Sequence, residues 1–452
     1  MTVRILTGVE PRHEALVARH LASLPGVELV RRCPDLADLV AAASAGLADA
    51  AIVSAGLRGI DRDTLGHLRD CGVVAVGLVD DEEQERRLRQ LGVAATLPAD
   101  CTAEEIDAVL TRSLGRGSAE AGAVSDEEWA ALEAGLDPAG APAPPDTQDP
   151  RERAGRGRLV VVWGPAGAPG RTSVAINLAG ELALTGRSVL LIDADTYGAS
   201  IGQALGLLDE APGLAAAARA AELGTLDVPT LARLSPVVEP GFRVLTGLPS
   251  ASRWPEVRAD SMGHLLDLAR ALSQVVVVDI GFCLEDDEEL SYDTRAPRRN
   301  AVAVTTLAEA NAVVAVGAGD PVGLQRLVRA LPDVQAVSPR VPTVVINKVR
   351  AGVAGASPAK RICEALDRFA AVSVEHTIPE DQGAFDKALL AGRLLSDVAP
   401  KSAARSRIRD IALAVAPDRA VAVAPAAAGA RQGKGSFGRL AAVRPSWRQG
   451  TS

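Results

Sequence analysis

Residues Leu159–Ala179 read LVVVWGPAGAPGRTSVAINLA. An apolar run, a glycine-rich turn and a helical pattern follow one another here, which predicts a buried strand, a loop and a helix. In such a loop, successive backbone N–H groups point at an anion, and the positive end of the helix adds to the attraction. Gly167 and Gly170 allow a close backbone approach, Arg171 brings a cation, and the Thr172 hydroxyl suits Mg²⁺. The stretch predicts a phosphate loop for a nucleoside triphosphate.

The loop departs at two places from the usual pattern G-x-x-x-x-G-K-[ST]. Pro165 stands at the first glycine and Arg171 at the lysine. Arginine keeps the positive charge and can bind phosphate through two N–H groups, although its planar head is bulkier than an ammonium group. The loop alone does not settle the prediction, which depends on the motifs that follow it.

Carboxylates follow at the ends of two further predicted strands. The segment SVLLIDADTYG ends in Asp193 and Asp195, and QVVVVDIGF places Asp279 after four valines. Since the carboxyl ends of parallel strands share one edge of a sheet, we expect these groups to meet the phosphate loop and to organise Mg²⁺ and water. The alternative is that each aspartate only caps a helix or a turn.

These motifs together resemble the MinD/ParA group of P-loop ATPases, whose loop reads K-G-G-x-G-K-[ST] and whose next strand ends in D-x-D. The resemblance covers roughly residues 159–415. It includes PTVVINKVR, where Asn347 falls at the adenine-reading asparagine, and IPEDQGAFDKALLAGR, which resembles the segment that lines the base. The implied fold is a mostly parallel α/β sheet with helices on both faces.

The resemblance implies ATP and Mg²⁺ as cofactors and assigns roles to named residues. The phosphates would be held by Gly167, Gly170, Arg171, Thr172 and Ser173; the metal by Thr172, Asp193 and Asp279; the base by Asn347, Pro379 and Glu380; and Asp193, Asp195 and Arg171 would serve hydrolysis.

One departure from the group bears on hydrolysis. The first lysine of the group's loop, which reaches across an ATP-sandwiched dimer, is Ala166 here. Because mobile charge at the transferring phosphoryl group supplies much of the rate, we expect hydrolysis to be weak or absent. A nucleotide-independent adaptor stays open as an alternative.

A narrower resemblance links the chain to actinobacterial CpaE-like proteins, also described as septum-site-determining. It rests on GAPGRTSVAINLA, LIDADTYG, FCLEDDEELSYDTRAPRRNA and DPVGLQRLVRAL, preceded by a receiver-like segment. It implies an ATP-dependent homodimer that positions a Tad-type pilus or secretion apparatus, or the division septum, through protein partners of those machines.

Residues 1–115 alternate short strands and helices in five βα units, which predicts a flavodoxin-like sheet. The segment resembles a response-regulator receiver without its phosphoryl chemistry. Ser54 stands where an acceptor aspartate is expected, Leu6-Thr7-Gly8 carries no acidic pair, and Leu97 replaces the lysine. We interpret it as a pseudo-receiver used for docking or dimer contact; the alternative is a domain that only adds stability.

The remaining segments complete the predicted organisation. Residues 116–157 form a flexible linker with one short helix at 125–136, residues 158–415 the nucleotide-binding domain, and residues 416–452 a disordered basic tail. The end of that tail, residues 436–452, mixes arginines with apolar residues, so a short interfacial helix at the inner face of the membrane is an alternative to a free tail.

Composition limits the classes of function. The 452 residues carry a net charge of −9, so no general basic field draws the chain onto DNA, and a ParA-like DNA-partitioning role is only an alternative. Five scattered cysteines and the lack of a long apolar run predict a reduced, cytoplasmic protein.

Gly198–Gly202 fits the hydrolase pattern G-x-S-x-G, but Ser200 does not directly follow a strand, which a nucleophile elbow requires.

Overall fold

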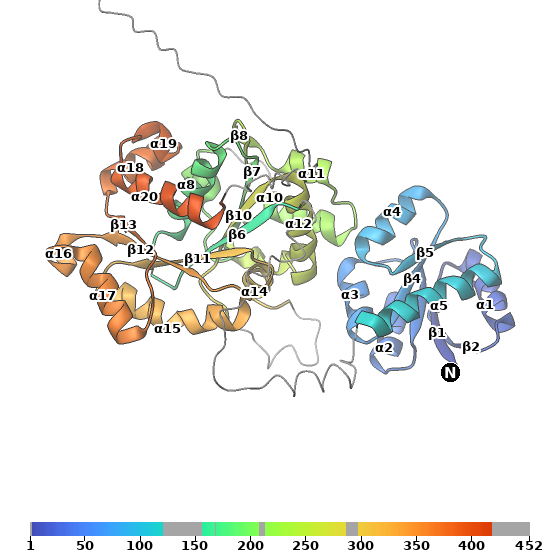
Figure 1. The fold of residues 1–452 in the computed structure, drawn as a ribbon. Coiled ribbons are helices and arrows are strands. Elements are labelled where there is room, and N and C mark those ends of the chain that lie inside the picture. The colour runs from blue at the N-terminus through green and yellow to red at the C-terminus, as the bar shows by residue number, and fades with distance from the viewer. Residues whose placement is uncertain (1, 121–155, 168, 208–212, 286–296, 418–452) are drawn as a thin grey trace, which may run out of the picture. The chain divides into compact units, whose positions relative to one another are not determined.

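Two sheets form the protein, and each is built from strands that alternate with helices (Figure 1). The computed structural model describes residues 2–120, 156–167, 169–207, 213–285 and 297–417. The predicted helix at 125–136, the tail beyond 417 and part of the charged run after Phe282 lie outside these residues. Among the described residues, no helix combines the length and the apolarity that a membrane crossing needs.

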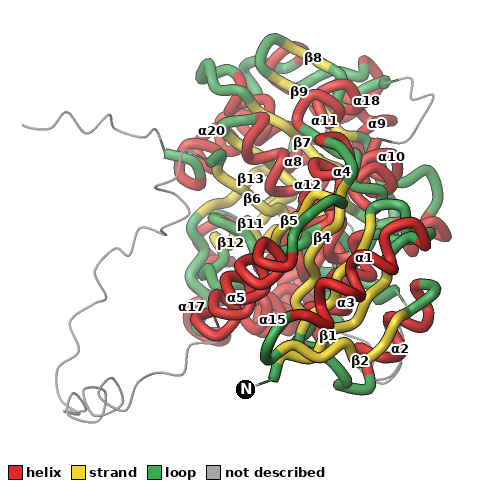
Figure 2. Tube along the Cα trace, turned by 90° about the vertical axis from the view of Figure 1, so that its right-hand side faces the viewer, coloured by secondary structure: helices red, strands yellow, loops and turns green. Residues whose placement is uncertain are grey.

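The N-terminal sheet is fully parallel and has the strand order β2-β1-β3-β4-β5. Figure 2 shows β1 and β2 as neighbours in this sheet. The strands are β1 (Val3–Gly8), β2 (Val27–Arg32), β3 (Ala50–Ser54), β4 (Val74–Val79) and β5 (Ala95–Pro98). This order is that of flavodoxin-like folds, so the predicted α/β architecture of this segment is confirmed.

Helices cover both faces of the N-terminal sheet, over two separate apolar clusters. Three of them begin at an aspartate whose side chain accepts a backbone N–H, at Asp35, Asp61 and Asp81. The helices are α1 (Pro11–Ser23), α2 (Leu36–Ser44), α3 (Arg62–Asp70), α4 (Glu82–Leu91) and α5 (Ala103–Glu120). Helix α5 therefore continues five residues beyond the predicted start of the linker at 116.

The second sheet has eight strands in the order β13-β12-β11-β6-β10-β7-β9-β8. All its pairs are parallel except β8 with β9. The strands are β6 (Arg158–Trp163), β7 (Val189–Ala194), β8 (Val237–Glu239), β9 (Phe242–Leu245), β10 (Val275–Ile280), β11 (Ala312–Ala318), β12 (Thr343–Val349) and β13 (His376–Pro379).

Alternating side chains of the central strands enter two cores, one on each face of the sheet. Leu159, Val161 and Trp163 of β6 enter one core, while Val160 and Val162 enter the other. A strand that is buried on both faces reads as a continuous apolar run, which explains the four valines of β10. The mostly parallel sheet with helices on both faces is confirmed.

The helices of this sheet divide between its two faces (Figure 1). On the first face lie α10 (Gly213–Glu222), α11 (Val228–Leu234), α12 (Ala259–Leu272), α14 (Ala301–Ala308), α15 (Pro321–Val337) and α17 (Pro358–Ala370). On the second lie α8 (Arg171–Ala183), α18 (Gln382–Ala391), α19 (Leu395–Val398) and α20 (Ala403–Val415). Shorter turns are α9 (Ile201–Ala204), α16 (Ala351–Ala354) and the 3₁₀ helix η1 (Ala251–Glu256).

The strand register brings the polar ends of the central strands to one edge. Asp279 of β10 pairs with Asp193 of β7 on one side and with Val162 of β6 on the other. Asn347 of β12 pairs with Ala318 of β11. The carboxyl edge of the sheet is therefore where the loop after β6 meets these side chains.

Candidate functional site

The loop between β6 and α8 depends on glycine backbone geometry. Gly167 and Gly170 have φ values of 106° and 94°, in the left-handed region that other residues rarely adopt. Gly170 immediately precedes α8, so the free N–H groups of the first turn of this helix open at the loop. A side chain on Gly170 would overlap the Asn347 amide, whose Nδ2 donates to the Pro169 carbonyl at 2.8 Å. The loop and β12 are thus joined directly.

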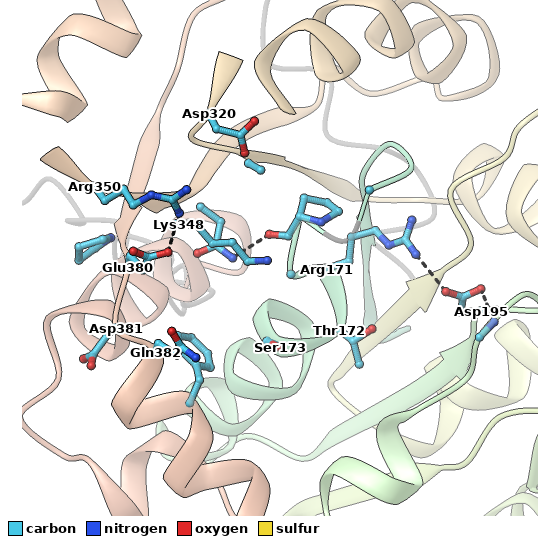
Figure 3. Close-up of a pocket in the computed structure, with 18 residues that line it drawn as sticks. Arg171, Thr172, Ser173, Asp195, Asp320, Lys348, Arg350, Glu380, Asp381 and Gln382 are labelled. Atoms are coloured by element: carbon cyan, nitrogen blue, oxygen red, sulfur yellow. Dashed lines mark hydrogen bonds and ion pairs between the residues drawn. The ribbon is translucent and has the colours of Figure 1, made fainter. Parts of the chain in front are cut away.

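A pocket of about 730 Å³ opens beside this loop (Figure 3). The residues to which the sequence assigned site roles and which line this pocket are Gly167, Gly170, Arg171, Thr172, Ser173, Asp195, Asn347, Pro379 and Glu380. The fold therefore gathers these side chains from four distant segments of the chain. Asp193 and Asp279 are not among the lining residues, because both are buried behind the pocket wall with 1% exposure.

Arg171 does not extend freely into the pocket. Its Nη2 donates to Asp195 Oδ2 at 3.0 Å and its Nη1 to the Gly164 carbonyl at 2.8 Å, and Figure 3 shows the guanidinium turned toward Asp195. Asp195 Oδ1 also accepts the N–H groups of Tyr197 and Gly198, at 2.9 and 3.2 Å. An anion in the pocket would have to share or displace this ion pair.

Asp279 and Thr172 form the inner contact of the site. The Thr172 hydroxyl donates to Asp279 Oδ2 at 2.6 Å, while Asp279 Oδ1 is buried and has no hydrogen-bond partner among the described residues. Burial, followed by the negative charge of Asp193, raises the pKa of Asp279 to about 8. The Asp279 oxygen that has no hydrogen-bond partner is a suitable ligand for a cation or for water bound to a cation.

Asp193 has a different environment from Asp279. Its Oδ2 accepts the N–H groups of Ser200 and Ile201 at 2.9 and 2.8 Å, just where α9 begins. Burial raises the pKa of Asp193 to about 6, against the lowering effect of these backbone donors. Asp193 Oδ1 accepts the Asp195 N–H at 3.3 Å, so both oxygens bind backbone groups, as the capping alternative predicts. A role of Asp193 in metal binding stays a prediction.

The pocket also contains polar residues that the sequence motifs did not single out. Lys348 follows Asn347 with a φ of 57°, which is unusual for a residue other than glycine. Arg350 forms an ion pair with Glu380 at 2.6 Å (Figure 3), and Asp320 also lines the pocket. Two of them lie within INKVR, so the motif around Asn347 held the signal.

Comparisons with known proteins agree with this architecture. The model of the family CbiA, the CobQ/CobB/MinD/ParA nucleotide binding domain, matches residues 160–390. A search of curated proteins finds no match.

Similar solved structures include a ParA family ATPase from Chlorobium tepidum at 18% identity and TM-score 0.47, covering 57% of this chain and 98% of that one. MinD from Pyrococcus furiosus matches at 18% identity and TM-score 0.44, and the match covers 57% of this chain and 97% of that one. The septum site-determining protein MinD complexed with Mg-ADP, from Pyrococcus horikoshii, matches at 17% identity and TM-score 0.44, and the match covers 57% of this chain and 96% of that one.

Since the family model spans just over half of the residues, the chain belongs to the CobQ/CobB/MinD/ParA nucleotide binding domain family.

Proposed function

We propose that this protein is an ATP-binding switch of the MinD/ParA type with weak or absent hydrolysis. The observation that carries the proposal is the pocket itself. It joins a glycine-dependent loop at the start of α8 to a polar wall from β12 and β13. A loop that opens on a helix N-terminus suits phosphate, and a family defined by nucleotide binding supports a nucleotide as the ligand.

The predicted residues form two groups in the pocket. Gly167, Gly170, Thr172 and Ser173 lie at the loop end, where backbone N–H groups would hold phosphates, and Arg171 would add a cation once released from Asp195. Pro379 and Glu380 line the pocket at the end of β13, and Asn347, which donates to the Pro169 carbonyl of the loop, would frame the base together with them. We infer that the nucleotide extends between these groups.

The residues near Thr172 fit Mg²⁺. The ligand set offered by Thr172, Asp193 and Asp279 is all oxygen, as Mg²⁺ prefers, and Asp279 Oδ1 lacks a protein partner. Bound Mg²⁺ would neutralise charge on the phosphate oxygens. Asp279 would have to be ionised to bind it, so a cation would lower the pKa that burial raises.

The charges around the loop support the expectation of weak or absent hydrolysis. Ala166 cannot supply a second cation, and Arg171 is bound to Asp195, the carboxylate expected to orient water. Arg171 would have to leave Asp195 before its charge could act on the transferring phosphoryl group. We therefore expect a long-lived ATP state, which suits a switch more than an enzyme of high turnover.

The proposed output is spatial placement, as in CpaE-like proteins. On this view residues 1–115 are a pseudo-receiver, 116–157 a linker, 158–415 the nucleotide-binding domain and 416–452 a basic tail. ATP would bring two copies together and position a Tad-type pilus or secretion apparatus, or the division septum. A ParA-like role on DNA has less support, because the net charge of the chain is −9.

A fluorescent ATP analogue tests the proposal. We expect saturable binding by the full chain in the presence of Mg²⁺, and at least tenfold weaker binding by Arg171→Ala. Light scattering on the same samples should show dimers only with ATP. Arg407→Ala is a matched control outside the pocket, because this arginine is exposed and pairs with Asp410 at the surface.

The competing function is a nucleotide-independent adaptor. The Arg171–Asp195 pair favours it, because the pair neutralises the loop cation without a ligand. An adaptor would bind neither the analogue nor unlabelled ATP, and its mass would not change. That result would overturn the switch.

A further inference from the structure

Three metal-ligating side chains converge at the carboxyl edge of the N-terminal sheet. Glu10 follows β1, His13 lies in the first turn of α1, and Asp80 follows β4. Strands β1 and β4 both flank β3 in parallel, so their ends meet at one edge. One carboxylate oxygen from each acid and a ring nitrogen of the histidine lie within 4.8 Å of one another.

The His13 ring nitrogen lacks a hydrogen bond. Nε2 is shielded from solvent and has no hydrogen-bond partner among the described residues, although it lies 3.1 Å from Asp80 Oδ1. The two atoms are close, but they are not aligned as donor and acceptor. Ligands around one tetrahedral ion stand about 3.4 Å apart, given metal–ligand distances of about 2.1 Å. The spacing suits two ligands of a shared cation.

The other oxygen of each carboxylate is held in place. Arg12 Nη2 donates to Glu10 Oε2 at 2.9 Å and to Asp80 Oδ2 at 2.7 Å. The Glu10 backbone N–H donates to Ser54 Oγ at 3.0 Å. Gly56 also makes room, because a side chain there would overlap the Glu10 carboxylate. Glu10 Oε1 and Asp80 Oδ1 are thus left on carboxylates that are already fixed.

Charge also favours a cation at this place. Two carboxylates face one guanidinium, and a metal ion binds the neutral form of an imidazole, so the metal-binding form of the cluster carries one negative charge. The side chains of Glu10, His13 and Asp80 are 28%, 15% and 28% exposed, so the cluster is half-enclosed and reachable from solvent. An ion entering from solvent would meet the two carboxylates first, because His13 Nε2 is itself shielded.

We propose that Glu10, His13 and Asp80 bind one divalent first-row transition cation, with Zn²⁺ as the best fit. One imidazole nitrogen and two carboxylate oxygens form a ligand set that Zn²⁺ accepts, with one position left open. Mg²⁺ fits less well, because it prefers oxygen ligands and keeps its water. The site belongs to another sheet than the nucleotide pocket and does not depend on it.

Calorimetric titration of the full chain with Zn²⁺, after chelator treatment and without nucleotide, tests the site. We expect one tight equivalent, weakened at least tenfold in His13→Ala and unchanged in His20→Ala, which alters the other histidine of α1. Co²⁺ in place of Zn²⁺ should give a visible absorption band that His13→Ala removes. If His13→Ala fails to fold by circular dichroism, Asp80→Asn takes its place.

Asp80→Asn separates the proposal from a metal-free ion-pair cluster. It keeps the size of the side chain but removes the charge of one proposed ligand, so Zn²⁺ binding should weaken at least tenfold. No tight Zn²⁺ binding by the wild type, or equal binding by the wild type and the His13 or Asp80 variant, would overturn the site.

Discussion

Replacing Gly170 with alanine tests how the phosphate loop is joined to β12. Gly170 has a φ of 94°, and a side chain there would overlap Asn347 Nδ2. Gly186 is a matched control, since its φ is 85° and a side chain there would meet nothing within 4 Å. Both substitutions place alanine in the left-handed region, and only one of them disturbs a neighbour.

The expected loss of stability has two sources, the left-handed backbone conformation and the overlap with Asn347. A left-handed alanine costs about 1–2 kcal/mol, which is the whole expected loss for Gly186→Ala. Gly170→Ala adds the displacement of Asn347, which is 4% exposed and bonded to the Pro169 carbonyl at 2.8 Å. Losing that buried hydrogen bond costs about 1–3 kcal/mol more. We therefore expect a total of roughly 2–5 kcal/mol at position 170.

Urea unfolding of both variants, with and without Asn347→Ala, measures these terms. In the Asn347→Ala background the overlap is gone, so the cost of Gly170→Ala should fall to that of Gly186→Ala. Equal costs for the two glycine substitutions in the wild-type background, or additivity of Gly170→Ala with Asn347→Ala, would refute the reasoning.

Two further predictions concern buried carboxylates. Burial raises the folded-state pKa of Asp279 to about 8, so this group lowers the free energy of unfolding as pH rises from about 4 to 8. The Asp279→Asn variant should therefore have a higher melting temperature than wild type at pH 8 but not at pH 5. Thermal melts without Mg²⁺ measure this, and an equal gap at both pH values would contradict it. Glu181 is 4% exposed and pairs with Arg405 at 2.5 Å, so Arg405→Ala should cost about 3 kcal/mol by urea unfolding. Arg407→Ala, which breaks an exposed pair with Asp410, should cost less than about 1 kcal/mol, and similar losses for both would be the contrary result.

The sequence predicted the central strands and the edge at which their polar ends meet. Buried parallel strands read as apolar runs, and Asp279 after four valines therefore marked both a strand and its end. The glycines of the loop were predictable for a similar reason, because Gly167 and Gly170 are needed for a backbone that other residues rarely adopt.

Contacts that depend on tertiary structure were not predictable. The pairing of Arg171 with Asp195 spans 24 residues and neutralises the loop cation at the pocket wall. The left-handed conformation of Lys348 lies where the pairing of β12 with β13 is interrupted, so it depends on a neighbouring strand and not on the local sequence alone. Glu10, His13 and Asp80 meet only because the strand order brings the ends of β1 and β4 together.

The nucleotide that the protein retains tests the central claim most directly. The full chain is incubated with Mg²⁺ and ATP, passed rapidly through a desalting column, denatured, and its nucleotide identified by chromatography. We predict about one nucleotide per chain, still present as ATP after many minutes. No retained nucleotide, or complete conversion to ADP within the mixing time, would contradict the proposed slow ATP switch.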